Sequence, residues 1–188
     1  MKKLAVFASG NGSNFQAIFD SIKLGETDAE ISLVVSDKPQ AGVIERAKSV
    51  NVPAYCFIPK EYEAKADYEH AILSVLENNK IDFVILAGYM RLIGDTLLNA
   101  YENRIVNIHP SLLPAFPGKD AVGQAFQAGV KVTGVTVHFV DAGMDTGPII
   151  AQKAIEIEAE DTIEAIAKKI HKVEHMLYPK VIKELVSK

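Results

Sequence analysis

The sequence predicts an α/β fold: an open, mostly parallel, doubly wound sheet of about seven strands with helices on both faces. Up to residue 108, short apolar runs alternate with stretches of helical periodicity, which is typical of βαβ units. Helices cover both faces of such parallel sheets. The chain has 188 residues, of which 48% are hydrophobic and 23% charged. This length and composition predict a single domain over residues 1–188 with a substantial core.

The earlier elements follow from that alternation. Continuous apolar runs predict strands at 3–8, 31–36, 53–57, 82–87 and 104–108. Apolar residues at helical spacing predict helices at 14–24, 41–49, 62–79 and 95–101. The rhythm then stops, because residues 109–120 contain three prolines and no period. We expect a long loop there, and such loops in compact domains are usually functional.

The later elements complete the predicted sheet and cover it. We expect a short helix at 121–128, a strand at 132–140 and an antiparallel strand at 149–157. A long C-terminal helix follows, because apolar residues recur at helical spacing, namely Ile163, Ile166, Ile170, Val173, Leu177, Val181 and Leu185. Asp161 with Glu164 resembles a capping arrangement at its start. Pro179 is expected to kink or interrupt this helix.

Composition excludes several classes of protein. The net charge is −4 and no basic block is present, which argues against nucleic acid as the main partner. No apolar run approaches the roughly 20 residues of a membrane span. The start of the chain mimics a signal peptide, but its apolar run is too short. The single cysteine, Cys56, allows no internal disulfide, so we expect a cytoplasmic protein, and its apolar neighbours predict a core thiol.

A glycine loop, Ser9–Asn14, lies between the first predicted strand and the first predicted helix. Its glycines let the backbone approach a ligand, and free N–H groups at a helix start favour an anion. A dinucleotide fingerprint would need a small residue where Phe15 stands, and no Gly-Lys-Ser/Thr is present. The pattern therefore favours a monophosphate. The alternative is a plain turn with Ser13 or Asn14 as the helix N-cap.

Asn107, His109 and Asp145 stand at the ends of two predicted strands, where open α/β sheets bind ligands. An amide can donate to an oxyanion, and an imidazole can do the same while carrying a proton. A nearby carboxylate favours the imidazolium and orients the ring. Taken singly, His109 could be an ordinary loop histidine and Asp145 part of a plain turn.

Two other chemistries fit the sequence poorly. His171 and His175 lie four residues apart on the predicted C-terminal helix, but no third metal ligand is near, so we expect no metal. Ser111 could serve a hydrolase only with a Gly-x-Ser-x-Gly elbow, which is absent.

The pattern Asn107-x-His109-Pro110-Ser111, followed by Asp145-x-Gly147, resembles the folate-dependent formyltransferase family. With the glycine loop, the resemblance is strongest to members that formylate glycinamide ribonucleotide, and it runs from residue 3 to about residue 185. It implies transfer of a formyl group from 10-formyltetrahydrofolate to the amine of 5-phospho-ribosylglycinamide (GAR), a step of purine biosynthesis. Direct amine attack through a tetrahedral oxyanion would need no metal.

The resemblance also implies which residues bind each substrate. For GAR, the first region is Gly12, Ser13 and Asn14 at the phosphate. The second region is His171, Lys172, Val173 and Glu174, in which Glu174 lies near the amine. For the folate they are Lys65 at the glutamate tail, the pterin pocket of Met90, Arg91, Leu92 and Ile93, the amide of Asn107, and an opposite wall of Asp141, Ala142, Gly143, Met144 and Asp145. By pattern alone, Lys65 is a solvated helix residue and the 90–93 segment is plain core.

Several alternatives stay open. Related formyltransferases for tRNA or sugars and a formyltetrahydrofolate hydrolase would carry further domains, so we expect the GAR enzyme. An NAD-dependent oxidoreductase could use Asp37 at a ribose, and a binding module would not need His109. Several relatives carry histidines where this chain has Lys119-Asp120, so that loop could be a lid or a strut. The expected partners are small molecules, and a homodimer is left open.

Overall fold

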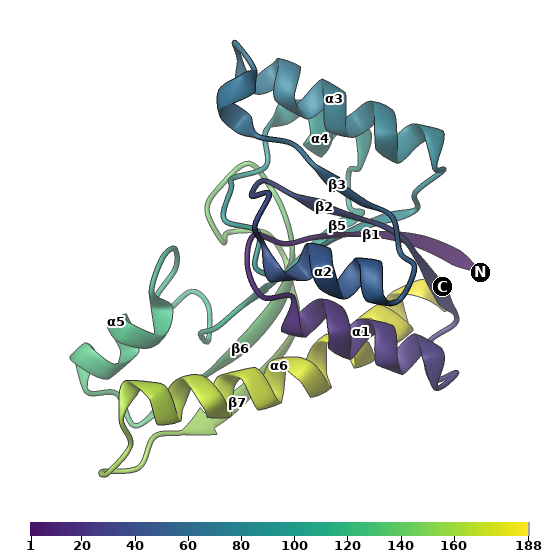
Figure 1. The fold of residues 1–188 in the computed structure, drawn as a ribbon. Helices are drawn as coiled ribbons and strands as arrows, with labels where there is room; N and C mark the ends of the chain where they lie inside the picture. The colour runs from purple at the N-terminus through teal and green to yellow at the C-terminus, as the bar shows by residue number, and fades with distance from the viewer. Residues whose placement is uncertain (188) are drawn as a thin grey trace.

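The computed structural model describes residues 1–187 and contains one seven-stranded sheet between layers of helices (Figure 1). The strands are β1 (Lys2–Phe7), β2 (Ala29–Ser36), β3 (Ala54–Cys56), β4 (Phe83–Leu86), β5 (Ile105–His109), β6 (Val132–Phe139) and β7 (Ile149–Glu156). The helices are α1 (Ser13–Lys23), α2 (Gly42–Ser49), η1 (Pro59–Glu61, a 3-10 turn), α3 (Lys65–Asn78), α4 (Asp95–Ala100), α5 (Ala121–Ala128) and α6 (Ile163–Val186). The predicted fold class is confirmed, and every predicted strand and helix is present within a few residues of its expected bounds.

The strand order is β3-β2-β1-β4-β5-β6-β7. Neighbours from β3 to β5 pair in parallel, whereas β6 pairs antiparallel with β5 on one side and with β7 on the other. The predicted antiparallel pairing late in the chain is therefore confirmed, and β6 is the strand that runs against the rest. The chain leaves β1 toward β2 and later returns to its other side with β4, which makes a topological switch point. Open α/β sheets bind ligands beyond the carboxyl ends of strands at such a point.

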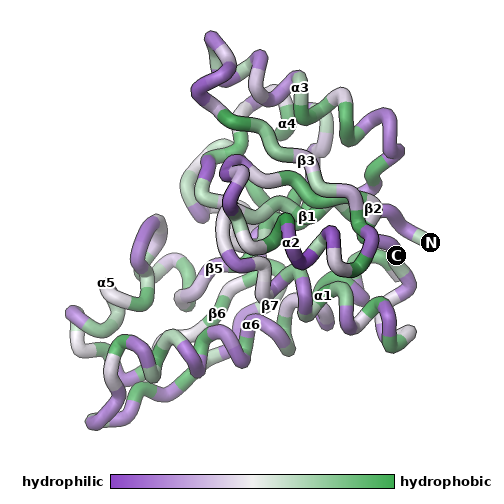
Figure 2. The backbone as a smooth tube through the Cα atoms, viewed as in Figure 1, coloured by the Kyte–Doolittle hydropathy of each residue, from purple (hydrophilic) through white to green (hydrophobic). Residues whose placement is uncertain are grey.

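Alternate residues of the central strand serve two cores. Leu4 and Val6 of β1 pack in the cluster that includes α1, α2 and α6, whereas Ala5 and Phe7 pack in the cluster that includes α3 and α4. All four side chains are fully buried, which explains why the run is continuously apolar rather than alternating. Figure 2 shows apolar residues concentrated along the central strands, with polar and apolar residues mixed along the outer helices.

Tyr178 of α6 ties this helix to the sheet. Its ring is fully buried, and its hydroxyl lies 2.8 Å from the Leu86 carbonyl oxygen and 3.0 Å from the Val106 carbonyl oxygen. These carbonyls belong to the neighbouring strands β4 and β5. Because a hydroxyl has one proton, the two acceptors share it. The contact holds α6 directly beneath the carboxyl ends of the strands that lead into the functional loops.

Two predictions about α6 are corrected. Pro179 does not interrupt the helix, which runs from Ile163 to Val186 with the proline ring buried inside it. Packing against the core outweighs the hydrogen bond that proline cannot donate. The helix N-cap is Thr162, whose side chain accepts from the Ala165 N–H at 3.2 Å. Asp161 instead pairs with Lys169 at 2.6 Å.

The prediction of a core thiol at Cys56 is wrong. The residue ends β3, the outer strand of the sheet, and is exposed. An apolar run on an edge strand faces solvent on one side, and the sequence does not tell an edge strand from a central one. Partial burial, with Asp37 and Glu61 nearby, still raises the pKa of this thiol. Among residues 1–187, no helix is long and apolar enough to cross a membrane.

We expect Tyr178→Phe to lower the free energy of unfolding by about 1–3 kcal/mol, because two buried carbonyls lose their shared donor. Urea unfolding followed by circular dichroism measures the change. Tyr55→Phe is the matched control, since Tyr55 is 37% exposed on the edge strand, and its effect should stay within about 0.5 kcal/mol. Equal effects of the two substitutions would contradict the role given to the Tyr178 hydroxyl.

Candidate active site

The glycine loop turns sharply into α1 beneath α2. Gly12 has φ 79°, and a Cβ atom there would lie 2.8 Å from Val43 of α2. Only glycine therefore fits this position. Gly12 is itself the N-cap of α1, and no side chain caps this end. The alternative in which Ser13 or Asn14 caps the helix is wrong, and the first amides of α1 are left open to an anion.

Asn14 and Glu174 meet where α1 packs against α6. The Asn14 Nδ2 donates to Glu174 Oε2 at 3.1 Å, across 160 residues of sequence. Glu174 is only 6% exposed. Burial raises the pKa of its carboxyl, against the opposing effects of the Asn14 hydrogen bond and the charge of His171. Within the described residues, Asn14 Oδ1 is buried without a partner. The glycine loop thus faces a buried carboxyl on α6.

The other predicted residues of α6 surround Glu174 loosely. His171 and Lys172 are exposed and Val173 is half-buried. The His171 ring stacks on His175 with centroids 6.3 Å apart. Burial and the charges of His171 and Arg46 lower the pKa of His175. No group of three or more His, Cys, Asp or Glu side chains that could hold a metal ion occurs in the part of the chain that the structure describes.

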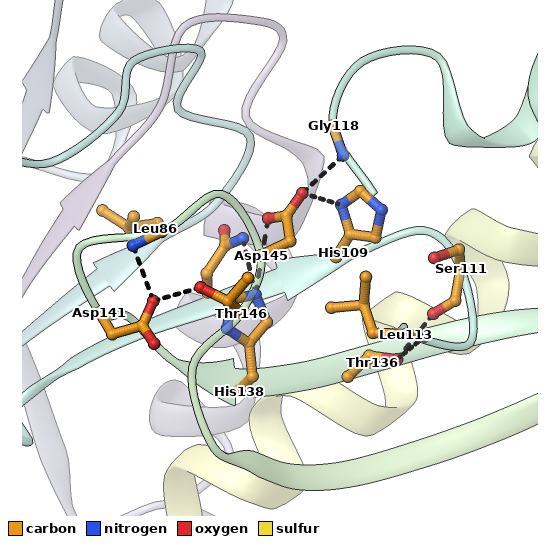
Figure 3. A network of polar contacts seen from close by, with 12 residues as sticks. Leu86, His109, Ser111, Leu113, Gly118, Thr136, His138, Asp141, Asp145 and Thr146 are labelled. Atoms are coloured by element: carbon orange, nitrogen blue, oxygen red, sulfur yellow. Dashed lines mark hydrogen bonds and ion pairs between the residues drawn. The ribbon is translucent and has the colours of Figure 1, made fainter. Parts of the chain in front are cut away.

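His109 and Asp145 come together at the end of β5, as Figure 3 shows, and Asn107 lies two residues earlier on the same strand. The His109 Nδ1 lies 3.4 Å from Asp145 Oδ2. Asp145 stands in the turn after β6, between His109 and a second imidazole, His138, whose Nε2 lies 3.7 Å from Asp145 Oδ1. His138 pairs directly with Asn107 in the β5–β6 register, and the Asn107 Nδ2 lies 3.3 Å from His138 Nε2. His138 therefore joins the three predicted residues, and we call Asn107, His109, His138 and Asp145 the quartet.

Hydrogen bonds assign a role to each imidazole. The His138 Nδ1 donates to the Phe139 carbonyl at 2.8 Å, and its Nε2 lies between the Asn107 amide and the Asp145 carboxylate. The His109 Nε2 donates to the Phe116 carbonyl at 2.8 Å, while its Nδ1 faces Asp145. Both ring nitrogens of His109 therefore face acceptors, an arrangement that suits an imidazolium.

Asp145 is held as a carboxylate. Burial alone would raise its pKa, but the His138 imidazole, the Gly118 N–H and the charge of His109 together lower it below its ordinary value. The Gly118 N–H donates to Asp145 Oδ2 at 2.7 Å. Asp145 adopts φ 56°, and a Cβ atom on the nearby Gly147 would overlap the Phe139 carbonyl oxygen. The tight turn thus aims the carboxylate back at the sheet.

The long loop between β5 and α5 is tied down at several points. Thr136 Oγ1 donates to the Ser111 carbonyl at 2.7 Å and accepts from the Leu113 N–H at 3.0 Å (Figure 3). Asp120 is the N-cap of α5 and accepts from the Gly123 N–H. Lys119 is exposed. These bonds favour a strut over a lid for this segment, and they explain the aspartate at position 120.

Four of the eleven residues expected at the folate line one cleft. A cavity of about 380 Å³ is lined by Lys65, Leu92, Ile93 and Ala142, among others. Met90 and Met144 are exposed, at 61% and 57%. Asp141 Oδ1 accepts from the Gly143 N–H at 3.0 Å and from the Thr146 hydroxyl at 2.7 Å, which shapes the 141–146 turn. The cleft joins the start of α3 to the two loops that follow β4 and β6.

Sequence reasoning missed His138 and the partners of Asp37. His138 interrupts an apolar run, and that interruption was the available signal. The Asp37 carboxylate, considered above as a ribose contact, accepts from the Ser9 hydroxyl at 2.5 Å and from Arg91 Nε at 3.1 Å. Both of its oxygens are therefore engaged by protein groups, which leaves the oxidoreductase alternative without its main residue.

Strands β5 and β6 of this α/β sheet carry an amide and two imidazoles, and the turn after β6 adds a carboxylate. Such a set of groups is typical of an enzyme and can transfer protons and stabilise an oxyanion. The family model described as Formyl transferase matches residues 2–182. The chain belongs to the formyl transferase family and is a formyltransferase.

Individual relatives are similar over almost the whole chain. Phosphoribosylglycinamide formyltransferase of Bacillus subtilis (strain 168) is 64% identical over 186 residues, which cover 99% of this chain and 95% of that one. The crystal structure of phosphoribosylglycinamide formyltransferase from Bacillus halodurans matches with TM-score 0.97 and 57% identity, over 100% of this chain and 96% of that one. Glycinamide ribonucleotide transformylase 1 from Geobacillus kaustophilus matches with TM-score 0.96 and 62% identity, over 98% of each chain.

The raised pKa of Glu174 predicts a pH-dependent stability. The folded protein keeps this proton to higher pH than the unfolded chain, so stability falls as pH rises from about 4 through the folded pKa. Glu174→Gln cannot ionise, and its amide oxygen can still accept from Asn14. We therefore expect the free energy of unfolding of this variant, relative to that of the wild type, to increase as the pH rises from about 4 to about 8. Urea unfolding measures the difference. Glu184→Gln, exposed on the same helix, is the matched control. A constant difference for Glu174→Gln would contradict the raised pKa.

Proposed function

We propose that this protein transfers the formyl group of 10-formyltetrahydrofolate to the amine of GAR, giving formyl-GAR, in purine biosynthesis. The observation that supports the proposal is that helix α6 contacts both Asn14 beside the glycine loop and the strands β4 and β5. Glu174 and Tyr178 are one turn apart on α6 and so share a face. Tyr178 contacts the carbonyl of Val106, the residue before Asn107. The buried carboxyl opposite the glycine loop therefore lies close to the quartet.

Each substrate has a region of matching chemistry. The open amides of α1 at Gly12, Ser13 and Asn14 suit the phosphate of GAR, and the buried Glu174 suits its amine. His171, Lys172 and Val173 complete that side. The cleft beside Lys65, with the loop from Met90 to Ile93, suits the folate, and the turn from Asp141 to Asp145 forms its opposite wall. This arrangement brings the formyl carbon and the amine together near Asn107.

The reaction proceeds by direct attack. The amine lone pair of GAR forms a bond to the formyl carbon, and the carbonyl electrons move to its oxygen. The Asn107 amide and protonated His109 donate to this oxyanion. The proton lost by the attacking nitrogen passes through His109 or a water to N10 of the folate. The oxyanion electrons then re-form the carbonyl as the bond between carbon and N10 breaks, and the electrons of that bond stay on N10, which releases tetrahydrofolate.

His109 must exchange one hydrogen bond before it can act. Its Nε2 donates to the Phe116 carbonyl in this structure, so the substrate oxygen has to replace that acceptor. Asp145 keeps the other ring nitrogen oriented throughout, because its own position is held by the Gly118 N–H. Alignment of the two substrates supplies much of the remaining acceleration.

We infer that the partners are these small molecules and that the protein works in the cytoplasm. The exposed free thiol of Cys56 fits a reducing compartment.

The proposal is tested by mixing the purified protein with GAR and 10-formyltetrahydrofolate and following the folate absorbance. We expect turnover only when GAR is present. Turnover without GAR would make the enzyme a formyltetrahydrofolate hydrolase, and inactivity with both substrates would overturn the choice of GAR as acceptor.

We expect His109→Ala to lower kcat about 100-fold or more, because general acid–base groups contribute that much. Asp145→Asn should also lower kcat substantially, since it removes the charge that orients the ring. Both variants should keep the circular dichroism spectrum of the folded protein. The matched control is His70→Ala, because His70 is an exposed histidine of α3. Near-normal kcat in either site variant would remove that residue from the mechanism.

A further inference from the structure

A second buried polar cluster lies, like the quartet, near the carboxyl ends of the parallel strands. Ser9 follows β1, Asp37 follows β2, and Arg91 stands in the loop after β4. These three strands are neighbours, in the order β2-β1-β4. Their carboxyl ends therefore meet, and side chains far apart in the sequence come into contact there. The mechanism proposed above uses neither Ser9 nor Asp37.

The hydrogen bonds of this cluster converge on the loop after β4, residues 88–93. The Ser9 hydroxyl donates to Asp37 Oδ1 at 2.5 Å and accepts from the Met90 N–H at 2.9 Å. The Ser9 N–H donates to the Gly88 carbonyl at 3.0 Å. Arg91 Nε donates to Asp37 Oδ2 at 3.1 Å. Ser9 and Asp37 thus hold this loop at three successive points.

The Asp37 carboxylate is buried and therefore depends on its few partners. The Asp37 side chain is 5% exposed, whereas that of Arg91 is 43% exposed. A buried carboxylate is tolerated only with close partners, and Arg91 is its one cationic partner among residues 1–187. The guanidinium also lies 5.8 Å from the centre of the Tyr68 ring. The Arg91 side chain is therefore held by Asp37 through its Nε, while the rest of the guanidinium remains accessible.

We propose that Ser9 and Asp37 are positioning residues for the folate co-substrate. They hold residues 88–93 in the shape that receives it, and they orient Arg91, without touching the folate themselves. This inference rests on the proposed function, because it assumes that this loop forms one wall of the folate cleft. Since the pair acts on a binding wall and not on the reacting atoms, its loss affects folate binding more than the chemical step.

Asp37→Asn tests the proposal, because asparagine keeps the shape of the side chain but loses the charge. We expect the KM for 10-formyltetrahydrofolate to rise about tenfold, the size expected when a charge-assisted hydrogen bond is weakened. The kcat and the KM for GAR should change less than about twofold. Thermal melting shows whether the variant is folded. If it is not, Ser9→Ala replaces it, with the same expected rise because Met90 loses its acceptor.

A double-mutant cycle separates positioning from general damage. Asp37→Asn alone should raise the folate KM about tenfold. If Asp37 acts through Arg91, the same substitution made in an Arg91→Gln protein should raise the folate KM by much less. Asp82→Asn is the matched control, since Asp82 accepts from the Lys3 N–H at 2.7 Å at the opposite edge of the same sheet. Its folate KM should equal that of the wild type.

The outcomes distinguish this inference from the proposed function. An inactive wild-type protein would overturn the proposed function. An active wild type whose Asp37→Asn and Ser9→Ala variants keep a normal folate KM would overturn the positioning role alone. So would a fall in kcat with the folate KM unchanged. Full additivity of the Asp37 and Arg91 substitutions would overturn the claim that Asp37 orients Arg91.

Discussion

The antiparallel pairing of β5 with β6 is the constraint on which the rest of the site depends. The register sets His138 opposite Asn107, and β6 ends opposite Val106, so the turn that follows β6 folds back along β5 toward His109. Asp145 therefore reaches His109 from above the sheet. A slip of one residue would move His138 to the other face of the sheet and so away from Asn107. The buried Tyr178 fixes the same region from below, because its hydroxyl reaches the backbone of both β4 and β5.

Each buried charge of the site opposes folding on its own and is tolerated because of its partners. Asp145 remains ionised because two imidazoles and one N–H outweigh its burial. Glu174 has fewer partners, and its pKa rises instead. Asp37 is paired with Arg91. Polar networks of this kind are costly when partly satisfied, so their concentration at one edge of the sheet is itself a mark of function.

Local patterns predicted most of the fold, and their failures have a common cause. Apolar runs and helical periodicity located the strands and helices, because those signals depend on neighbours in the sequence. Cys56 was misplaced because an edge strand reads like a central one. Pro179 was expected to kink or interrupt α6, and the helix is not interrupted, because burial of the ring within the core outweighs its missing hydrogen bond. The alternative in which Ser13 or Asn14 caps α1 is wrong, because the cap is Gly12, where Val43 leaves no room for a Cβ atom.

The sequence by itself determined the fold class, the glycine loop and the positions of Asn107, His109 and Asp145 at strand ends, since residue type and spacing carry that information. Only the tertiary structure decided which side chains meet. His138 joins the quartet through strand register, Asn14 meets Glu174 through helix packing across 160 residues, and Ser9, Asp37 and Arg91 meet because three strands are neighbours. The physical reason is that these contacts are fixed by sheet order and packing, which no local pattern records.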